Sequence, residues 1–132
     1  MYFRVRAATI ILNKNNELLL VHHRHPKTGE EWWTLPGGGL EGEESATDAI
    51  IREVKEECKI SCIPQRLVYV REFLDCKDDI HHVELFFTAT VKDYQIERGT
   101  DPELKEQYII DVRFLSRYDI ENLPVAVFPE IL

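Results

Sequence analysis

Three glutamates are spaced so that a helix would carry their carboxylates on one face. Glu53, Glu56 and Glu57 follow the spacing i, i+3, i+4, and residues at this spacing are neighbours on a helix surface. On a helical wheel they lie beside the apolar stripe of their segment, where like charges repel one another. A hard divalent cation would remove that repulsion, because it takes oxygen ligands. Arg52 and Lys55 offer the alternative of a solvated face with ion pairs between successive turns.

A run of glycines precedes these glutamates. Gly37, Gly38 and Gly39 would let the backbone approach a ligand closely, with amide or carbonyl groups turned toward it. An ordinary glycine turn is the alternative. Residues 38–60 also hold seven carboxylates and three cations, so half of the net charge of −8 lies within 23 residues. This concentration favours a divalent cation, which would let an acidic protein bind an anionic substrate.

The glycines, Glu44 and the glutamate segment stand at fixed spacings. Gly38 is followed by five residues and Glu44, and then by seven residues and the segment 52–60, which reads Arg-Glu-Val-Lys-Glu-Glu-Cys-Lys-Ile. Residues 38–60 therefore resemble the Nudix box, G-x5-E-x7-R-E-U-x-E-E-x-G-U, in which U is an aliphatic residue. Every charged position matches. Lys59 is the one departure, because the family has glycine there.

The resemblance implies both a fold class and an activity. The fold would be α/β, a Nudix α/β/α sandwich around a mixed β-sheet, in a single domain over residues 1–132. The activity would be that of a hydrolase that uses Mg²⁺, or Mn²⁺ in its place. Its substrate would be a nucleoside diphosphate linked to a further group X, cleaved at the pyrophosphate bond. A Nudix-like module that senses a nucleotide without hydrolysis is the alternative, and the intact carboxylates argue against it.

The family pattern also assigns roles to the residues of the box. Carried over by position, Glu56 and Glu57 are expected to be the principal metal ligands. Glu53 would be a third ligand or the catalytic base. The backbone carbonyl of Gly37 or Gly38 often adds a ligand in this family.

Further acidic and basic partners follow from the same resemblance. Arg52 in this family orients the glutamates through an ion pair, and Glu44 is its expected partner. The family commonly adds one acidic residue from a loop distant from the box, as base or ligand. Glu103 and Glu106 lie in such a loop before the last expected strand, and we favour Glu106. A solvated loop carboxylate is the alternative.

Residues outside this motif, and one within it, complete the set of candidates. Arg6 and Arg24 are candidate phosphate contacts, one on the first expected strand and one after the second. Trp32 and Trp33 are more often packing residues, although one of them could stack on a base. Lys59 is expected to end its helix in a left-handed conformation, which costs a non-glycine residue about 1 kcal/mol or more. It should affect loop shape and stability more than chemistry.

Strands and helices must position these side chains. Strands are expected over residues 3–12, 18–21, 32–35, 66–74, 83–91 and 108–115. The first two are expected to form a hairpin across the polar turn at residues 13–16. Helices are expected over residues 45–58 and 117–123. Mixed strands with few helices indicate an α+β protein or an α/β sandwich.

The expected helix at residues 45–58 would carry the glutamates. Ser45 is a candidate N-cap, with Asp48 three residues later. The apolar side of this helix consists of Ile50, Ile51, Val54 and Cys58. The strand at residues 83–91 alternates in polarity, so Glu84 is expected on the face opposite its apolar side chains.

Composition bounds the partners and the location. The chain has 132 residues and a net charge of −8, and a surface of that sign repels duplex nucleic acid, so no nucleic acid polymer is expected. Its longest apolar runs are four residues, far short of a bilayer span, so no membrane partner is expected. Three cysteines without a C-x-x-C pair favour reduced thiols in a cytoplasm. The expected partners are a small-molecule nucleotide and, because dimers are common in the family, a second copy of the chain.

The sequence leaves the identity of the group X open. In the family, a proline or a tyrosine at set distances after the box marks the ADP-ribose and dinucleoside polyphosphate subgroups. Residues 75–78, Asp-Cys-Lys-Asp, show neither. Nucleotide sugars, modified nucleoside triphosphates and coenzymes all stay open as substrates.

Overall fold

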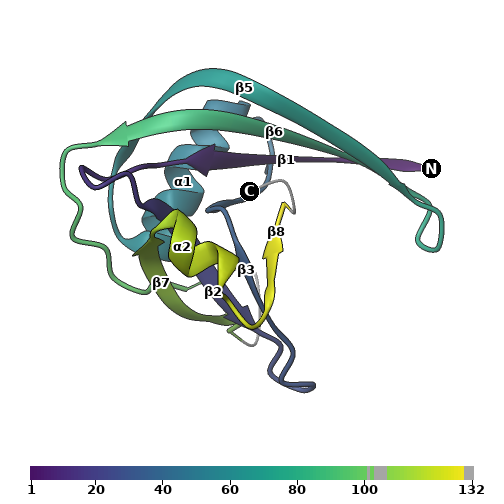
Figure 1. Ribbon diagram of the computed structural model, residues 1–132. Coiled ribbons are helices and arrows are strands. Elements are labelled where there is room, and N and C mark those ends of the chain that lie inside the picture. The colour runs from purple at the N-terminus through teal and green to yellow at the C-terminus, as the bar shows by residue number, and fades with distance from the viewer. Residues whose placement is uncertain (101, 103–106, 130–132) are drawn as a thin grey trace.

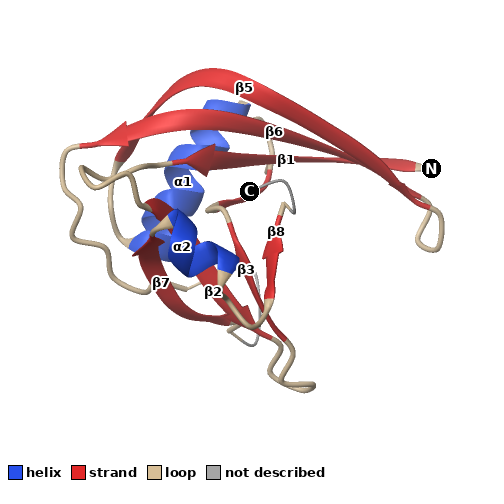
Figure 2. Ribbon diagram, in the orientation of Figure 1, coloured by secondary structure: helices blue, strands red, loops and turns tan. Residues whose placement is uncertain are grey.

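The strands form two four-stranded sheets within residues 1–100, 102 and 107–129, which this computed structural model describes (Figures 1 and 2). The first sheet has the order β4–β1–β6–β5. Its central pair, β1 (Tyr2–Ile10) and β6 (Ile80–Val91), is parallel. The outer strands β4 (Gly37–Gly39) and β5 (Cys62–Asp75) run antiparallel to their neighbours.

The second sheet has the order β7–β2–β3–β8. In it, β2 (Leu18–Arg24) pairs antiparallel with β3 (Glu31–Thr34) and with β7 (Ile109–Leu115). The short strand β8 (Ala126–Phe128) runs parallel to β3. Both sheets are mixed, so the α/β class expected from the sequence is confirmed, with the strands divided between two sheets instead of one.

Helix α1 (Ala46–Cys58) carries the glutamates and begins as the sequence predicts. The Ser45 side chain accepts a hydrogen bond from the Asp48 amide, and the Asp48 carboxylate accepts one from the Ser45 amide. This capping box pairs two of the amides that a helix start leaves without partners. At the other end Lys59 has a φ of 61°, so the predicted left-handed terminus is confirmed.

The second helix of the described residues, α2 (Arg117–Glu121), also lies where the sequence predicts one. It begins with the same pattern, because Ser116 and Asp119 form a capping box. Across the described ranges, no helix is long and apolar enough to cross a membrane.

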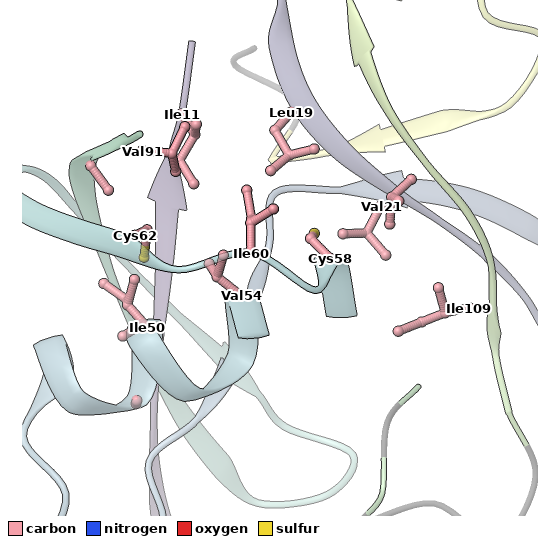
Figure 3. Packing of buried hydrophobic residues seen from close by; sticks show 14 residues of the cluster. Ile11, Leu19, Val21, Ile50, Val54, Cys58, Ile60, Cys62, Val91 and Ile109 are labelled. Atoms are coloured by element: carbon pink, nitrogen blue, oxygen red, sulfur yellow. The ribbon is translucent and has the colours of Figure 1, made fainter. Parts of the chain in front are cut away.

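One face of the first sheet packs against α1. Ile50 and Val54 of the helix are fully buried with Ala7 and Ile11 from β1 and the residues after it, and Figure 3 shows how the cluster continues into both sheets. Ile51, expected on the same apolar side, is 43% exposed. It lies about 100° around the helix from Ile50, at the border of the contact with the sheet.

The other face of the first sheet packs against the second sheet. Ala8 of β1 and Phe86 of β6 share a buried cluster with Trp33 of β3. Successive side chains of a strand point to opposite faces, which is why Ala7 and Ala8 belong to different clusters. Helix α1 contacts β1, β4 and β5 of the first sheet and β7 of the second, and its buried cluster also contains residues of the second sheet, among them Val21 and Ile109. Ile120 of α2 packs against the other cluster, so the two helices cover different buried clusters of the pair of sheets.

The expected hairpin between residues 3–12 and 18–21 forms only next to its turn, where the Asn13 amide donates to the Glu17 carbonyl and the Leu19 amide to the Ile11 carbonyl. Leu12 and Leu18 form an isolated bridge, but β1 and β2 belong to different sheets. A turn signal acts locally, whereas pairing of β1 with β6 and of β2 with β7 buries apolar side chains on both faces of each strand. The glycine run forms β4 and pairs with β1, and neither β4 nor β8 is among the strands expected from the sequence.

Candidate functional site

A cleft of about 780 Å³ has walls from α1 and from both sheets. Glu53 and Glu57 lie on its α1 wall, and the glycines of β4 lie beside them. The fold therefore brings the glycine run and two of the three predicted ligands to one cavity. Two strands far apart in the sequence, β1 and β6, supply its floor, because they are adjacent in the first sheet.

The glutamates of α1 differ in their burial. Glu53 and Glu57 are each 4% exposed, whereas the Glu56 side chain is 23% exposed. The Gly37 amide donates a hydrogen bond of 2.9 Å to Oε1 of Glu57. A Cβ at Gly38 would overlap the Glu53 carboxylate. Because Gly38 has no side chain, the backbone of β4 lies directly against the Glu53 carboxylate.

Arg52 connects the carboxylates of this segment. Its Nε and Nη2 donate to the two carboxylate oxygens of Glu44 at 2.7 and 3.0 Å, so the predicted ion pair is confirmed and is bidentate. Its Nη1 donates to Glu53 at 2.9 Å and to Glu56 at 3.3 Å. Its Nη2 also donates to the Gly39 carbonyl at 3.2 Å. Such planar, charge-assisted contacts fix side-chain orientation as well as adding energy.

Arg52 and Glu44 each favour the ionised form of the other. Hydrogen bonds from Arg52, and then one from the Glu41 amide, hold the pKa of the Glu44 carboxyl below its usual value. The hydrogen bond to Glu44 raises the pKa of the Arg52 guanidinium further, against the opposing effect of burial. The pair therefore stays ionised at neutral pH and into the acidic range.

A metal site can be tested against this arrangement of donors. Carboxylate oxygens are the ligand type that Mg²⁺ takes, and Glu53, Glu56 and Glu57 supply them from one helix. Across the part of the chain that the structure describes, however, no three His, Cys, Asp or Glu side chains are already gathered as a ligand set. Glu53 and Glu56 share the guanidinium of Arg52, and Glu57 faces the Gly37 amide. The donor chemistry fits a hard cation, and its ligands would have to turn away from these partners to bind one.

The end of α1 is completed by a distant loop that sequence reasoning missed. The amides of Gly99 and Thr100 donate to the carbonyls of Glu57 and Glu56, at 2.8 and 3.0 Å, and the Glu97 amide donates to the carbonyl of residue 58 at 3.0 Å. These carbonyls have no partner inside the helix. A Cβ at Gly99 would overlap the Glu56 carbonyl. This glycine was the one sequence signal that could have indicated the close contact with α1.

Lys59→Gly is expected to stabilise the protein by up to about 1 kcal/mol, because it removes a left-handed non-glycine residue, with part of the gain offset by the freer unfolded chain. Turnover should stay within a few-fold, since Lys59 lines a separate pocket with Lys55 and Lys92 and not the cleft. Denaturant melts and initial rates would check both. A large loss of turnover would instead show that this lysine contacts the substrate.

A buried carboxylate on the cleft floor was also missed. Glu84 of β6 is 8% exposed and accepts from Arg6 of β1 at 3.2 Å and from Arg71 of β5 at 2.6 Å. Glu84 lies on the face opposite Val83 and Leu85, as predicted, but this face also carries the buried Phe86 and borders the cleft instead of solvent. The position of this glutamate two residues before Phe86, on the same face of the strand, was the available signal.

Of the remaining candidates, some line the cleft and others do not. Arg6 lines the cleft, and Arg4 joins it although the sequence did not single it out. Arg24 is exposed at the end of β2, and it is not among the described residues that line the cleft. Glu103 and Glu106 lie outside the described residues.

Comparisons with known proteins agree with the motif. A model of the NUDIX domain matches residues 2–129. An uncharacterized Nudix hydrolase of Bacillus subtilis, YvcI, is 33% identical over 128 residues, which are 96% of this chain and 75% of that protein. A putative ADP-ribose pyrophosphatase of the same organism, YjhB, is 30% identical over 91 residues, 67% of this chain and 42% of that protein. Among solved structures, a NUDIX hydrolase from Nitrosomonas europaea has a TM-score of 0.73 and 24% identity, covering 89% of this chain and 75% of that one.

Proposed function

Because this chain belongs to the Nudix hydrolase family, we propose that it cleaves the pyrophosphate bond of a nucleoside diphosphate linked to a further group X. Mg²⁺ is the proposed metal, with Mn²⁺ as a substitute. A small nucleotide is the proposed partner. A homodimer and a location in the cytoplasm stay expectations from the resemblance.

The observation that carries this proposal is the burial of Glu53 and Glu57 at the wall of a cleft. Each is 4% exposed, and burying an ionised carboxylate is costly unless charge or hydrogen bonding compensates it. Burying Glu53 and Glu57 next to Glu56 on α1 destabilises the fold, and a cation held by the three carboxylates would offset that destabilisation. An acidic cleft can bind an anionic diphosphate only through such a cation or through nearby arginines.

The roles of the residues follow from their positions. A bound divalent cation would supply charge neutralisation and a more acidic water molecule at the cleft. Glu56 and Glu57 would hold it, with the Gly38 carbonyl as a further ligand. Glu53 would be the third ligand or would accept the proton of the attacking water. Arg52 orients the carboxylates, and Arg6 would contact a phosphate oxygen.

One observation favours the alternative of a module that binds a nucleotide without hydrolysis. In the described ranges, the carboxylates do not stand as a ready ligand set. A binding module would need the cleft and its arginines but no bound metal. The two candidates therefore differ in whether added metal produces turnover.

The purified chain is expected to hydrolyse at least one compound from a panel of nucleoside diphosphate derivatives. The relative YjhB makes ADP-ribose the first compound, followed by nucleotide sugars and modified nucleoside triphosphates. Turnover should need added Mg²⁺ or Mn²⁺ and stop with a chelator, because the metal supplies the acidic water. Release of phosphorylated products would be followed by chromatography. Nucleotide binding without turnover at any metal concentration would favour the sensor.

A further inference from the structure

Three charged side chains form a row across the first sheet at the floor of the cleft. Arg6 of β1, Glu84 of β6 and Arg71 of β5 are directly opposite one another in the strand pairing, and the three strands lie side by side (Figure 1). Side chains of residues that are directly opposite point to the same face of a sheet, so these three meet. We name them the charged row.

The carboxylate of Glu84 is shared between the two arginines. Nη1 of Arg71 donates to Oε1 at 2.6 Å, and Nη1 of Arg6 donates to Oε2 at 3.2 Å. Both oxygens of Glu84 therefore accept from a cation, which leaves this carboxylate poorly suited to hold a metal ion as well. Its contacts point to a role toward the arginines.

Arg71 is fixed at the outer side of the charged row. Its guanidinium lies 4.6 Å from the centre of the Phe73 ring, a cation–π contact, and that ring stacks on His82 with centroids 4.5 Å apart. Arg71 is not among the described residues that line the cleft. It compensates the charge of Glu84 without itself lining the cleft.

Arg6 is the cation of the charged row that lines the cleft. A guanidinium carries five N–H donors, and the contact with Glu84 uses one nitrogen, so Arg6 keeps donors for a ligand. Two cations and one carboxylate leave the charged row with a net charge of +1. The next arginine on this face of β1, Arg4, lies opposite His82 instead of a carboxylate.

The charged row lies beside the carboxylates of α1. Arg6 pairs with Gly39, and the preceding residue, Gly38, lies against the Glu53 carboxylate. One residue along a strand and one strand across correspond to a distance of roughly 6 Å. A diphosphate held at α1 through a cation can therefore also reach Arg6.

A contact made before the ligand arrives favours binding. An arginine side chain has many rotamers, and fixing one of them costs entropy when a ligand binds. The hydrogen bond to Glu84 already restrains Arg6 in the unliganded protein. This preorganisation lowers the entropy that a bound phosphate would otherwise have to offset.

We propose that Glu84 and Arg71 are positioning residues for the anionic part of the substrate: Arg71 holds and compensates Glu84, and Glu84 holds Arg6 where its other donors contact a phosphate oxygen. The inference rests on the proposed function, because it uses Arg6 as the phosphate contact. It adds two residues that lie outside the family motif, and one of them does not line the cleft.

The sign of one substitution distinguishes this role from simple neutralisation. A carboxylate beside a phosphate contact would weaken anion binding if it only cancelled the charge of Arg6. Glu84→Gln would then bind anions more tightly. If Glu84 positions Arg6, the same variant binds them more weakly, although it removes a negative charge from the cleft.

Calorimetric titration with inorganic pyrophosphate, without metal and at low salt, measures this sign. Kd should rise about fivefold or more in Glu84→Gln and about tenfold or more in Arg6→Leu, because a hydrogen bond between charged groups is weakened or lost. Tighter binding by Glu84→Gln, or no binding by the parent chain up to millimolar concentration, would overturn the proposal. The Arg6 and Arg71 side chains are 32% and 36% exposed, so water can solvate them in Glu84→Gln.

Arg71→Met tests the part of the charged row that does not line the cleft. Its Kd for pyrophosphate should rise about threefold or more, because Arg71 is coupled to the anion through Glu84 and Arg6. Arg66→Met is the matched control, since Arg66 is exposed on the same strand and lies opposite Thr88. It removes the same charge, and its Kd should change by about twofold at most, because salt screens a distant exposed charge. Equal changes in the two variants would overturn the proposal.

A double variant shows whether Arg71 acts through Arg6. In the background of Arg6→Leu, Arg71→Met should add little further loss, because the cation that it helps to position is already gone. An undiminished effect in that background would overturn the proposal. If Glu84→Gln does not fold, the arginine variants decide the proposal by themselves.

Kinetics separate this inference from the proposed function. For a cleaved diphosphate, KM should rise in Arg71→Met by the same factor as Kd, with kcat within about threefold because the carboxylates of α1 are unchanged. Arg71→Lys should restore part of the loss, since it keeps the charge but not the planar guanidinium. An unchanged KM in Arg71→Met would overturn the inference and leave the hydrolase intact. Absence of hydrolysis with every compound would contradict the proposed function, while the pyrophosphate titrations would still decide the roles of Glu84 and Arg71.

Discussion

Glu57→Gln is expected to lower turnover about 100-fold or more while leaving the fold intact. Changes in residues that only support metal ligands already cost about 10- to 100-fold, and this change removes a charged ligand itself. The amide oxygen of glutamine can still accept the hydrogen bond that the Gly37 amide now donates to Glu57. The shape of the side chain is also conserved, so packing at the wall of the cleft should hold.

Two measurements would separate loss of metal from loss of structure. The parent chain should gain thermal stability with millimolar Mg²⁺, because a ligand that binds the folded state stabilises it by mass action, and Glu57→Gln should lose most of that gain. Glu43→Gln is the matched control, since Glu43 belongs to the same acidic segment but is exposed and is not one of the residues that line the cleft in the described chain. Parental turnover in Glu57→Gln would show that the proposed ligand set is wrong.

Gly38→Ala is expected to reduce turnover about 100-fold, the size of effect that a displacement of about 1 Å can cause in a catalytic group. A Cβ at this position would overlap the Glu53 carboxylate. The end of a flexible side chain can move away more easily than backbone can, so the carboxylate should shift while the helix stays in place. The thermal midpoint should fall much less than turnover does.

Gly39→Ala provides the comparison for this prediction. A Cβ built at Gly39 would make only ordinary contacts, the nearest being to the Arg4 guanidinium at 3.8 Å. Neither Gly38 nor Gly39 is among the described glycines with a positive φ. The two variants add the same methyl group to neighbouring residues of β4, so initial rates can be compared directly. Gly39→Ala should lose far less turnover than Gly38→Ala. Equal losses would point to a general requirement for glycine and not to the position of Glu53.

The features that the sequence predicts well depend on signals within one element. The capping box of Ser45 and Asp48 and the left-handed Lys59 are properties of a few neighbouring residues, and both are confirmed. The ion pair between Arg52 and Glu44 joins residues eight apart, and the fixed spacing of the family motif predicts it. The sequence therefore predicts how α1 begins and ends and how Arg52 is paired, before the position of the helix in the fold is known.

The features that the sequence did not predict depend on contacts between distant residues. Glu84 is buried because β1 and β5 flank β6 and bring Arg6 and Arg71 to its carboxylate. Alternation along a strand assigns side chains to faces but does not say which face a second sheet will cover. The expected hairpin does not extend beyond the residues next to its turn for the same reason, since strand partners compete over the whole chain.

The loop at residues 97–100 completes the end of α1 that carries the proposed metal ligands. This end of the helix therefore depends on residues that are synthesised after it. The carbonyls of Glu56 and Glu57 receive their partners from Thr100 and Gly99, more than forty residues later in the sequence. Bringing such distant segments together costs loop-closure entropy, which must be offset by contacts formed elsewhere first. During synthesis, α1 can therefore begin at its capping box as soon as it emerges, but the turn that carries these two glutamates acquires its last hydrogen bonds only after residue 100 has left the ribosome.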